Sequence, residues 1–340
     1  GGRGVHSRGL KKSWLPINCD ATPGLRCILS KCNNGHTYYW SNEAPTQCPF
    51  CSINVLKSGQ YMLFVRHGFT TAPWDPPRFT RRQEIVSVVE TATISFTENL
   101  DTCSVNSFGN VNGLLARYRD DGEIMVYNRG KNYLGFAICQ KCGYCDSEKR
   151  DYSHTDTGAV NLPNKYQYHA ALYQDKQFNK CWSDGIAQVW RGHLLAAREK
   201  TDVLLLDFSG VSGSAVCATD SSIMYALAFS MQRAVAQLLE LDIREVGVDL
   251  VPTGPAGKHF GITLFDNVPG GAGHVAQLLR PELQNDLLVA AKDRLFVDER
   301  HNNNCLTGCL DCVLSFETQR RISSGLFKRR EAYDFIRSLI

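Results

Sequence analysis

Several features that assign a protein to a class at first sight are missing from this sequence. No stretch approaches the ~18 unbroken apolar residues that a membrane-spanning helix needs. The basic N-terminal segment GGRGVHSRGLKK is not followed by an apolar stretch, so we expect no signal peptide. The formal net charge of +3 is too small to indicate a class of partner. These absences favour a cytoplasmic protein with no membrane association, and in that compartment disulfides are rare.

A nucleotide-binding loop is missing as well. The stretch LFVDERH, residues 295–301, imitates the DExH box of a helicase. Its partner would be the phosphate loop G-x-x-x-x-G-K-[ST]. The nearest match, GPAGKH, has Pro252 where the first glycine belongs and His259 in place of the hydroxyl residue. We therefore expect no ATP site in this chain.

The glycine-rich stretch FDNVPGGAGHV, residues 265–275, raises a related question. It has no following Lys-Ser or Lys-Thr, and it does not match G-x-G-x-x-G. We expect a tight turn that lets a helix approach a strand closely. The alternative is a nucleic-acid phosphate bound at the N-terminus of the following helix, with His274 as a donor.

Cysteine, by contrast, is abundant, with 14 residues. Most of them fall in tight groups. In a reducing compartment such spacing indicates metal sites rather than disulfides. The isolated residues Cys19, Cys103 and Cys217 are expected to be buried small apolar side chains.

The first group reads CNNGH, residues 32–36, followed by CPFC, residues 48–51. Two pairs of soft ligands at this separation predict a tetrahedral zinc site. The predicted ligands are Cys32, His36, Cys48 and Cys51. Cys27 is a fifth candidate and could replace His36. Free surface cysteines are the alternative, but four in so short a span would be prone to oxidation.

The second group is CQKCGYC, residues 139–145, which is typical of a zinc knuckle. It needs two further ligands from elsewhere. The predicted set is Cys139, Cys142, His169 and Cys181. Cys145 and His154 are the reserve ligands. A thioredoxin-like redox site is the alternative, but no strand-to-helix context supports it.

The third group is HNNNCLTGCLDC, residues 301–312. Its three cysteines, Cys305, Cys309 and Cys312, form most of a zinc site. His301 is the nearest candidate for the fourth ligand.

The distribution of apolar residues predicts the fold class. Short β-like runs such as EIMVYN and LGFAI occupy residues 61–138, and strands alternate with helices after residue 190, as in a small α/β domain. We therefore expect an α/β C-terminal domain with a mixed sheet and helices, a β-rich middle region and small zinc-ribbon-like modules. The predicted divisions are a linker (1–20), a small zinc finger (21–56), the β-rich region (57–138), a zinc-knuckle module (139–189) and the α/β domain with the terminal cysteine site (190–340).

Five segments of the second half occur in a familiar order: RGHLLAAREKTDVLLLDF, SSIMYALAFSMQRAVAQLLELDIREVGVDLVP, FDNVPGGAGHV, CLTGCLDCVLSFETQ and FKRREAYDFI. This order resembles the zinc-binding domain at the C-terminus of MrfA-type superfamily-two DNA helicases. Related domains occur in the helicases and accessory subunits of the DISARM and Druantia phage-defence systems. The upstream stretches GFTTAPWDPPRFTR and NRGKNYLGFAICQKCG also resemble the region that precedes this domain in the defence helicases.

The resemblance implies that Cys305, Cys309 and Cys312 bind zinc, although the family usually offers four cysteines. It also implies a non-catalytic region that contacts DNA and supports an ATP-dependent helicase motor, in the same polypeptide or another subunit, in phage defence or DNA repair. Clusters of basic residues could contact the DNA backbone. These are Arg3, Arg8, Lys11 and Lys12, then Arg78, Arg81 and Arg82, and finally Arg320, Arg321, Lys328, Arg329 and Arg330.

Two other functions remain open at this stage. One is a nuclease-like α/β enzyme that uses Asp249, Asp266 and His274, whose acids lie at strand ends. The other is a purely protein–protein interaction subunit of a defence complex.

Overall fold

The computed structural model describes residues 13–14, 26–34, 36–40, 45–48, 51–54, 59–65, 89–93, 104–130, 133–140, 143–148, 189–254, 257–268, 270–315 and 327–340. The strands are β1 (Ser13–Trp14), β2 (Arg26–Lys31), β3 (Thr37–Trp40), β4 (Gln60–Phe64), β5 (Val89–Thr93), β6 (Ser104–Ser107), β7 (Leu115–Asn128), β8 (Phe136–Cys139), β9 (Tyr144–Ser147), β10 (Val189–Asp207), β11 (Val246–Thr253) and β12 (His259–Asp266). The helices are α3 (Ser214–Cys217), α4 (Ser221–Leu238), the 3-10 turn η2 (Ile243–Glu245), α5 (His274–Gln277), α6 (Pro281–Leu295), α7 (Glu299–Asn304) and α9 (Arg329–Arg337).

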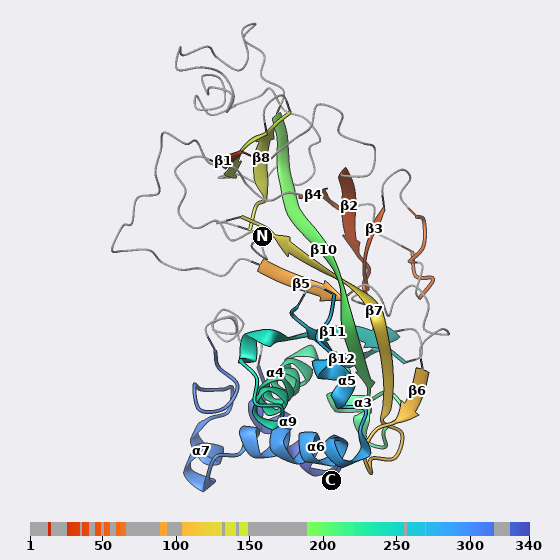
Figure 1. Cartoon of the computed structure of the whole chain (residues 1–340), viewed down its shortest axis with the longest axis vertical. Helices are drawn as coiled ribbons and strands as arrows, with labels where there is room; N and C mark the ends of the chain where they lie inside the picture. The colour runs from red at the N-terminus through yellow and green to blue at the C-terminus, as the bar shows by residue number, and fades with distance from the viewer. Residues whose placement is uncertain are drawn as a thin grey trace, which may run out of the picture.

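Strand β10 runs through the length of the molecule (Figure 1). Its first half pairs antiparallel with β8 and parallel with β4, and its second half pairs antiparallel with β12. Strand β7 follows it antiparallel, from Leu195↔Asn128 to Asp207↔Leu115. Two buried apolar runs of β10, around residues 194–196 and 203–206, flank a partly exposed polar stretch. Each apolar run therefore belongs to a different part of the core.

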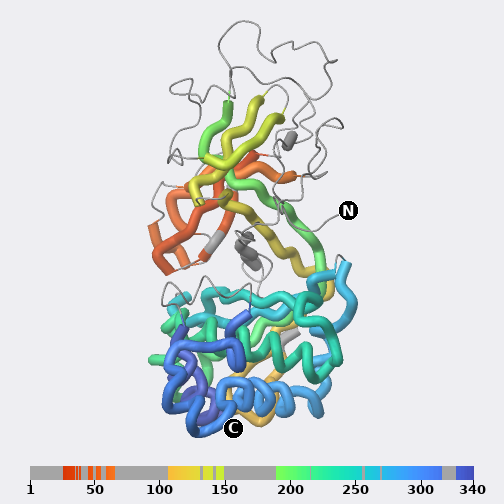
Figure 2. The backbone as a smooth tube through the Cα atoms, turned by 90° about the vertical axis from the view of Figure 1, so that its left-hand side faces the viewer, coloured from red at the N-terminus to blue at the C-terminus, as the bar shows by residue number. Residues whose placement is uncertain are grey.

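The remaining strands divide between the two ends of β10. Strands β2, β3 and β4 form one antiparallel group, and β8 and β9 form another. Strands β11 and β12 form an antiparallel hairpin on the other half of β10. Figure 2 shows the first two groups at the end of the molecule opposite α6 and α9.

Helices α4, α6 and α9 pack together beside the β10–β12–β11 part of the sheet. Asp220 caps the N-terminus of helix α4, and its carboxylate accepts the backbone N–H of Ser222 at 2.8 Å, a common way to satisfy a free helical N–H. Its apolar residues recur at helical spacing and bury one face. The main core includes Leu204, Leu206, Ile262, Leu264, Leu227, Met231, Leu288 and Ile336. Burial of each large aliphatic side chain contributes about 1.5–3 kcal/mol.

This arrangement confirms the predicted fold class, with one local difference. Strands alternate with a helix after residue 190 as predicted, because TDVLLLDF, REVGVDLVP and FGITLFD lie in strands and SSIMYALAF lies in a helix. The helix expected from His274 is a single turn of 4 residues. The chain then turns, and α6 begins separately at Pro281. Proline suits the first turn of a helix and cannot continue one from before, because it lacks a backbone N–H.

Among the helices that the structure describes, none is both long enough and apolar enough to cross a membrane.

Candidate metal centres

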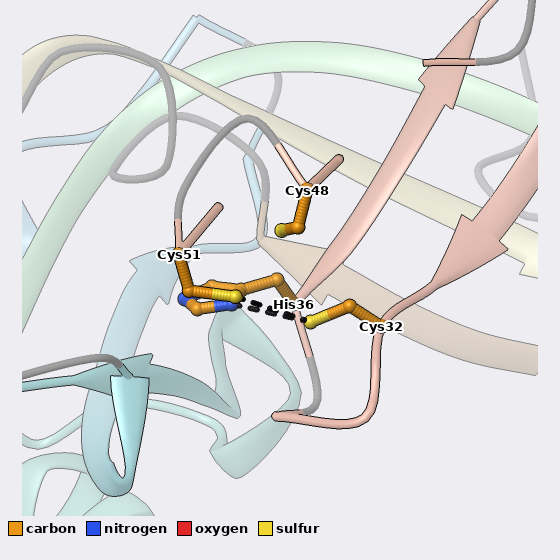
Figure 3. Close-up of side chains that lie close together, drawn as sticks. All are labelled: Cys32, His36, Cys48 and Cys51. Carbon is orange, nitrogen blue, oxygen red and sulfur yellow. Dashed lines mark hydrogen bonds between the residues drawn. The ribbon is translucent and has the colours of Figure 1, made fainter. Parts of the chain in front are cut away.

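The first cysteine group folds into a compact cluster (Figure 3). Cys32 follows β2, and the turn to β3 is closed by a hydrogen bond from its backbone N–H to the His36 carbonyl at 3.0 Å. A second tight turn, in which the Cys48 N–H donates to the Ile53 carbonyl at 2.8 Å, presents Cys48 and Cys51. The four ligand atoms lie within 4.8 Å of one another. Two short backbone turns therefore bring together the four side chains that the sequence analysis selected.

The distances in this cluster fit a tetrahedral zinc site. The Sγ atoms of Cys32 and Cys51 are 3.8 Å apart, and Cys32 Sγ lies 3.4 Å from His36 Nδ1. Zinc–sulfur bonds of about 2.3 Å in a tetrahedron place neighbouring sulfurs about 3.8 Å apart. The separations are far longer than a disulfide bond of about 2.05 Å. The donor set therefore fits zinc with His36 ligating through Nδ1.

Cys27 lies outside this cluster. It is on β2, 4% exposed, and packs against Met62, Phe64 and Leu194 in a separate apolar core. Burial raises the pKa of the Cys27 thiol to about 11. The open alternative, in which Cys27 would replace His36, is not supported by this geometry.

The C-terminal group also comes together. His301 lies on α7, whose N-terminus is capped by Asp298, and the three cysteines follow in a compact loop. Cys309 Sγ lies 3.3 Å from His301 Nε2, and the Cys305–Cys312 and Cys309–Cys312 sulfur pairs are 3.9 and 3.7 Å apart. All four ligand atoms lie within 4.8 Å of one another. His301, the predicted candidate for the fourth ligand, lies beside the three cysteines, where the family usually offers a fourth cysteine.

A buried arginine that the sequence analysis placed on DNA supports this second cluster instead. Arg329, at the start of α9, is 0% exposed. Its guanidinium donates to the carbonyls of Cys305 at 2.6 Å and Leu295 at 2.5 Å, and to the Asn302 side chain at 3.1 Å. The expectation that Arg329 contacts a phosphate backbone is therefore wrong, because the side chain is enclosed by protein carbonyls. No sequence signal distinguishes it from its neighbour Arg330.

The second cysteine group is described only in part. Cys142, His154, His169 and Cys181 lie outside the described residues, so the knuckle remains a prediction. Cys139 ends β8, and its carbonyl accepts the Gly143 N–H at 2.9 Å. Cys145 on β9 registers with Ile138 and packs into an apolar cluster. Because side chains alternate along a strand, this register places Cys145 on the face opposite to that of Cys139.

In the glycine turn between β12 and α5, two aspartate carboxylates of the protein accept the hydrogen bonds of the backbone N–H groups. Asp266 accepts the backbone N–H groups of Ala272, His274 and Val275 at 2.8–3.0 Å, and Asp202 accepts that of Gly273 at 3.0 Å. The groups that a phosphate would need are thus already hydrogen-bonded. The phosphate alternative for this turn is wrong, and the expected tight structural turn is present.

Asp202 lies at the irregularity of β10 between Thr201 and Val203. It also accepts the hydroxyl of Tyr118 at 2.5 Å. Burial and this hydrogen bond raise the pKa of Tyr118, so the phenol stays protonated and continues to donate. Sequence reasoning missed this second aspartate because its partners lie far away in the chain.

The residues proposed for a nuclease do not form a site. The oxygens of Asp266 bind the turn, and His274 Nε2 lies 3.4 Å from a Glu245 oxygen. Asp249 accepts the Tyr225 hydroxyl at 3.3 Å. Asp266 registers with Val246 and Asp249 with Thr263, so strand alternation directs the two aspartates to opposite faces. In the described parts of the chain, the groups able to hold a metal are the two clusters above.

Both helicase-like sequence matches have structural explanations. GPAGKH falls in the turn between antiparallel β11 and β12, whereas a phosphate loop joins a strand to a helix. In LFVDERH, Asp298 caps α7 by accepting the His301 N–H at 2.6 Å.

Of the basic clusters, only the last is partly described. Arg3, Arg8, Lys11, Lys12, Arg78, Arg81, Arg82, Arg320 and Arg321 lie outside the described residues. Lys328 forms a 2.7 Å ion pair with Asp220, and the Arg330 guanidinium donates to Asn303 at 3.3 Å.

One comparison with protein families covers the second cluster. Residues 227–313 match the family described as "MrfA Zn-binding domain". A search of curated proteins finds no match. The structure titled "Crystal Structure of DUF1998 helicase MrfA bound to DNA" aligns with 14% sequence identity and a TM-score of 0.35, over 70% of this chain and 24% of that chain. The matched family segment contains α6, α7 and all four side chains of the cluster formed by His301, Cys305, Cys309 and Cys312. This chain therefore contains an MrfA-type zinc-binding domain.

Proposed function

We propose that this chain is a zinc-stabilised, non-catalytic region that contacts DNA and supports an ATP-dependent DNA helicase. The observation that carries the proposal is the match of residues 227–313 to the MrfA zinc-binding family. The C-terminal part of this matched segment contains the cluster of His301, Cys305, Cys309 and Cys312. The motor would lie in the same polypeptide or in another subunit. Phage defence or DNA repair is the setting that the resemblance implies.

Both zinc ions would be structural. Each cluster offers four protein ligands, and such closed sites stabilise a fold, whereas catalytic zinc keeps a position for water or substrate. The proposed ligand sets are Cys32, His36, Cys48 and Cys51 in the first site, and His301, Cys305, Cys309 and Cys312 in the second. Zinc supplies folding free energy to polar modules with little apolar core of their own.

DNA contact would come from the basic residues near the C-terminus. Arg329 is excluded because it is buried, and Lys328 already pairs with Asp220. The remaining candidates are Arg320, Arg321 and Arg330. Their contacts would be to phosphates, so binding should show no sequence preference and should weaken as salt rises.

The test is a fluorescence-anisotropy titration of single-stranded and duplex oligonucleotides at several salt concentrations. Replacing Arg320, Arg321 and Arg330 by Ala should lower the affinity and reduce the salt slope by roughly two to three units. The matched control replaces Arg244, Arg280 and Lys292 by Ala, which removes the same charge from two exposed positions and one partly exposed position. Equal effects in the two triple variants would show that the C-terminal cluster is only surface charge. No binding by the unaltered chain at low salt would favour a protein–protein module instead.

A further inference from the structure

A glycine from the other half of the molecule lies against the first metal cluster. Gly257 lies in the turn between β11 and β12 and is buried, with a φ of +62°. A Cβ atom built at Gly257 would lie 2.2 Å from His36 Cε1 and 2.7 Å from His36 Nε2. The backbone of this turn therefore packs directly against the edge of the imidazole.

The two edges of the His36 ring have different neighbours. Its Nδ1 faces Cys32 Sγ at 3.4 Å, while its Cε1–Nε2 edge rests on Gly257. The ring is thus held between the cysteine sulfurs and the β11–β12 turn. Glycine meets two requirements at this position, because its φ lies in the left-handed region and no space exists for a side chain.

We infer that the first metal site docks its module onto the β11–β12 turn, with Gly257 as the positioning residue for His36. The inference rests on the proposal that this site holds zinc. Metal ligation fixes the ring, and the fixed ring provides the surface on which the turn packs. The site lies outside the family match, whereas Gly257 lies inside it. The contact therefore joins the additional module to the family domain.

The first test replaces Gly257 by Ala and measures zinc release to a competing chelator. The added methyl group must displace the ring that carries the proposed ligand, and mutation of groups that orient a metal ligand typically weakens metal affinity 10–100-fold. We expect a weakening of this size for one zinc ion, identified as the ion that is absent from a Cys48→Ser/Cys51→Ser variant. Gly213→Ala is the control, because Gly213 has a φ of +79° and no atom within 4 Å of a built Cβ. Unchanged zinc affinity in Gly257→Ala would overturn the inference.

The second test measures amide hydrogen exchange in peptides that contain Gly254 and Gly257, whose backbones share a 3.0 Å hydrogen bond. Cys48→Ser/Cys51→Ser should speed exchange in this turn, while Cys309→Ser/Cys312→Ser should leave it near the wild-type rate. Helix α4 serves as the internal reference for an intact fold. If the Cys48→Ser/Cys51→Ser variant exchanged the amides of this turn at the wild-type rate, the inferred docking would be contradicted. Elemental analysis distinguishes failure of the docking from failure of the proposed zinc site. A wild-type chain that binds no zinc at the first cluster would contradict the proposed ligand set, whatever the exchange rates show.

Discussion

At the scale of single residues, Arg329 is a fully enclosed charge beside a metal cluster. Its guanidinium binds carbonyl groups of Cys305 and Leu295 and the side chain of Asn302. These acceptors come from three successive segments: the end of α6, α7 and the cysteine loop. One planar side chain therefore fixes the positions of two elements that carry zinc ligands.

We expect Arg329→Ala to lower the free energy of unfolding by roughly 3–5 kcal/mol, because several buried acceptors lose their donor at once. It should also loosen the zinc bound by the His301–Cys312 cluster. Arg330→Ala is the control, since Arg330 is partly exposed and its guanidinium donates to Asn303. Urea unfolding and chelator competition are the measurements. Similar losses in both variants would show that burial of Arg329 has no special role.

His193 is a second residue that its surroundings hold tightly, because it is buried and hydrogen-bonded at both ring nitrogens. It is 0% exposed, its Nδ1–H donates to the Arg191 carbonyl at 2.9 Å, and its Nε2 accepts a hydrogen bond from Arg26 at 3.0 Å. Since Arg26 can only donate, Nε2 is the acceptor and Nδ1 carries the proton. The ring also stacks on Tyr61 and Trp190.

Burial lowers the pKa of His193 to about 4, with a further lowering by Arg26 and an opposing hydrogen bond to the Arg191 carbonyl. The stability that this neutral imidazole contributes is complete above its ordinary pKa of 6.5 and is lost as the pH falls toward 4. An NMR titration should therefore find His193 neutral, with the proton on Nδ1, at pH 5.5. Protonation near pH 6.5 would contradict the buried geometry.

At the scale of elements, the β12–α5 turn depends on two aspartates and on the absence of a side chain beside them. Gly270 and Gly271 both have positive φ, at +83° and +76°. A Cβ at Gly271 would lie 2.1 Å from an Asp202 carboxylate oxygen, whereas a Cβ at Gly270 has no atom within 4 Å. Alanine at position 270 therefore introduces backbone strain alone, whereas alanine at position 271 introduces both backbone strain and a steric overlap.

Gly270→Ala should cost about 1–2 kcal/mol, the usual penalty for a left-handed alanine. Gly271→Ala should cost about 1–3 kcal/mol more, because the methyl group displaces the carboxylate that holds the turn. Equilibrium urea unfolding of both variants gives the difference directly. Equal costs would mean that the Asp202 contact is easily rearranged.

The elements that sequence analysis predicted correctly are those encoded by local patterns. The spacing of apolar residues gives α4, and the spacing of cysteines selects the members of both described clusters. The continuation of β10 through Ala197–Lys200 was not predicted, because this polar stretch becomes a strand only through pairing with β7. The positions of Arg329 and Gly257 were equally inaccessible, since their partners are distant in the sequence.

At the scale of the whole molecule, the sequence predicts three zinc ions per chain, one for each cysteine group. The described residues account for two clusters, and the ion at the knuckle of Cys139 and Cys142 remains a prediction. Elemental analysis of protein purified without added metal should give a ratio near three. Cys48→Ser/Cys51→Ser should reduce the ratio by one. A ratio of one or less for the unaltered chain would contradict the prediction.

The continuity of β10 also has a mechanical consequence. The strand pairs with β4 and β8 at one end and with β12 at the other, so one continuous strand joins the two halves of the molecule. Strand β7 runs beside it across the junction, and their hydrogen bonds lie perpendicular to the strand axis. A force applied along β10 is therefore shared by many β7–β10 hydrogen bonds at once, because it acts at right angles to all of them. A force transmitted along β10 would therefore reach both the strands beside the first metal cluster and the sheet that carries the helical layer.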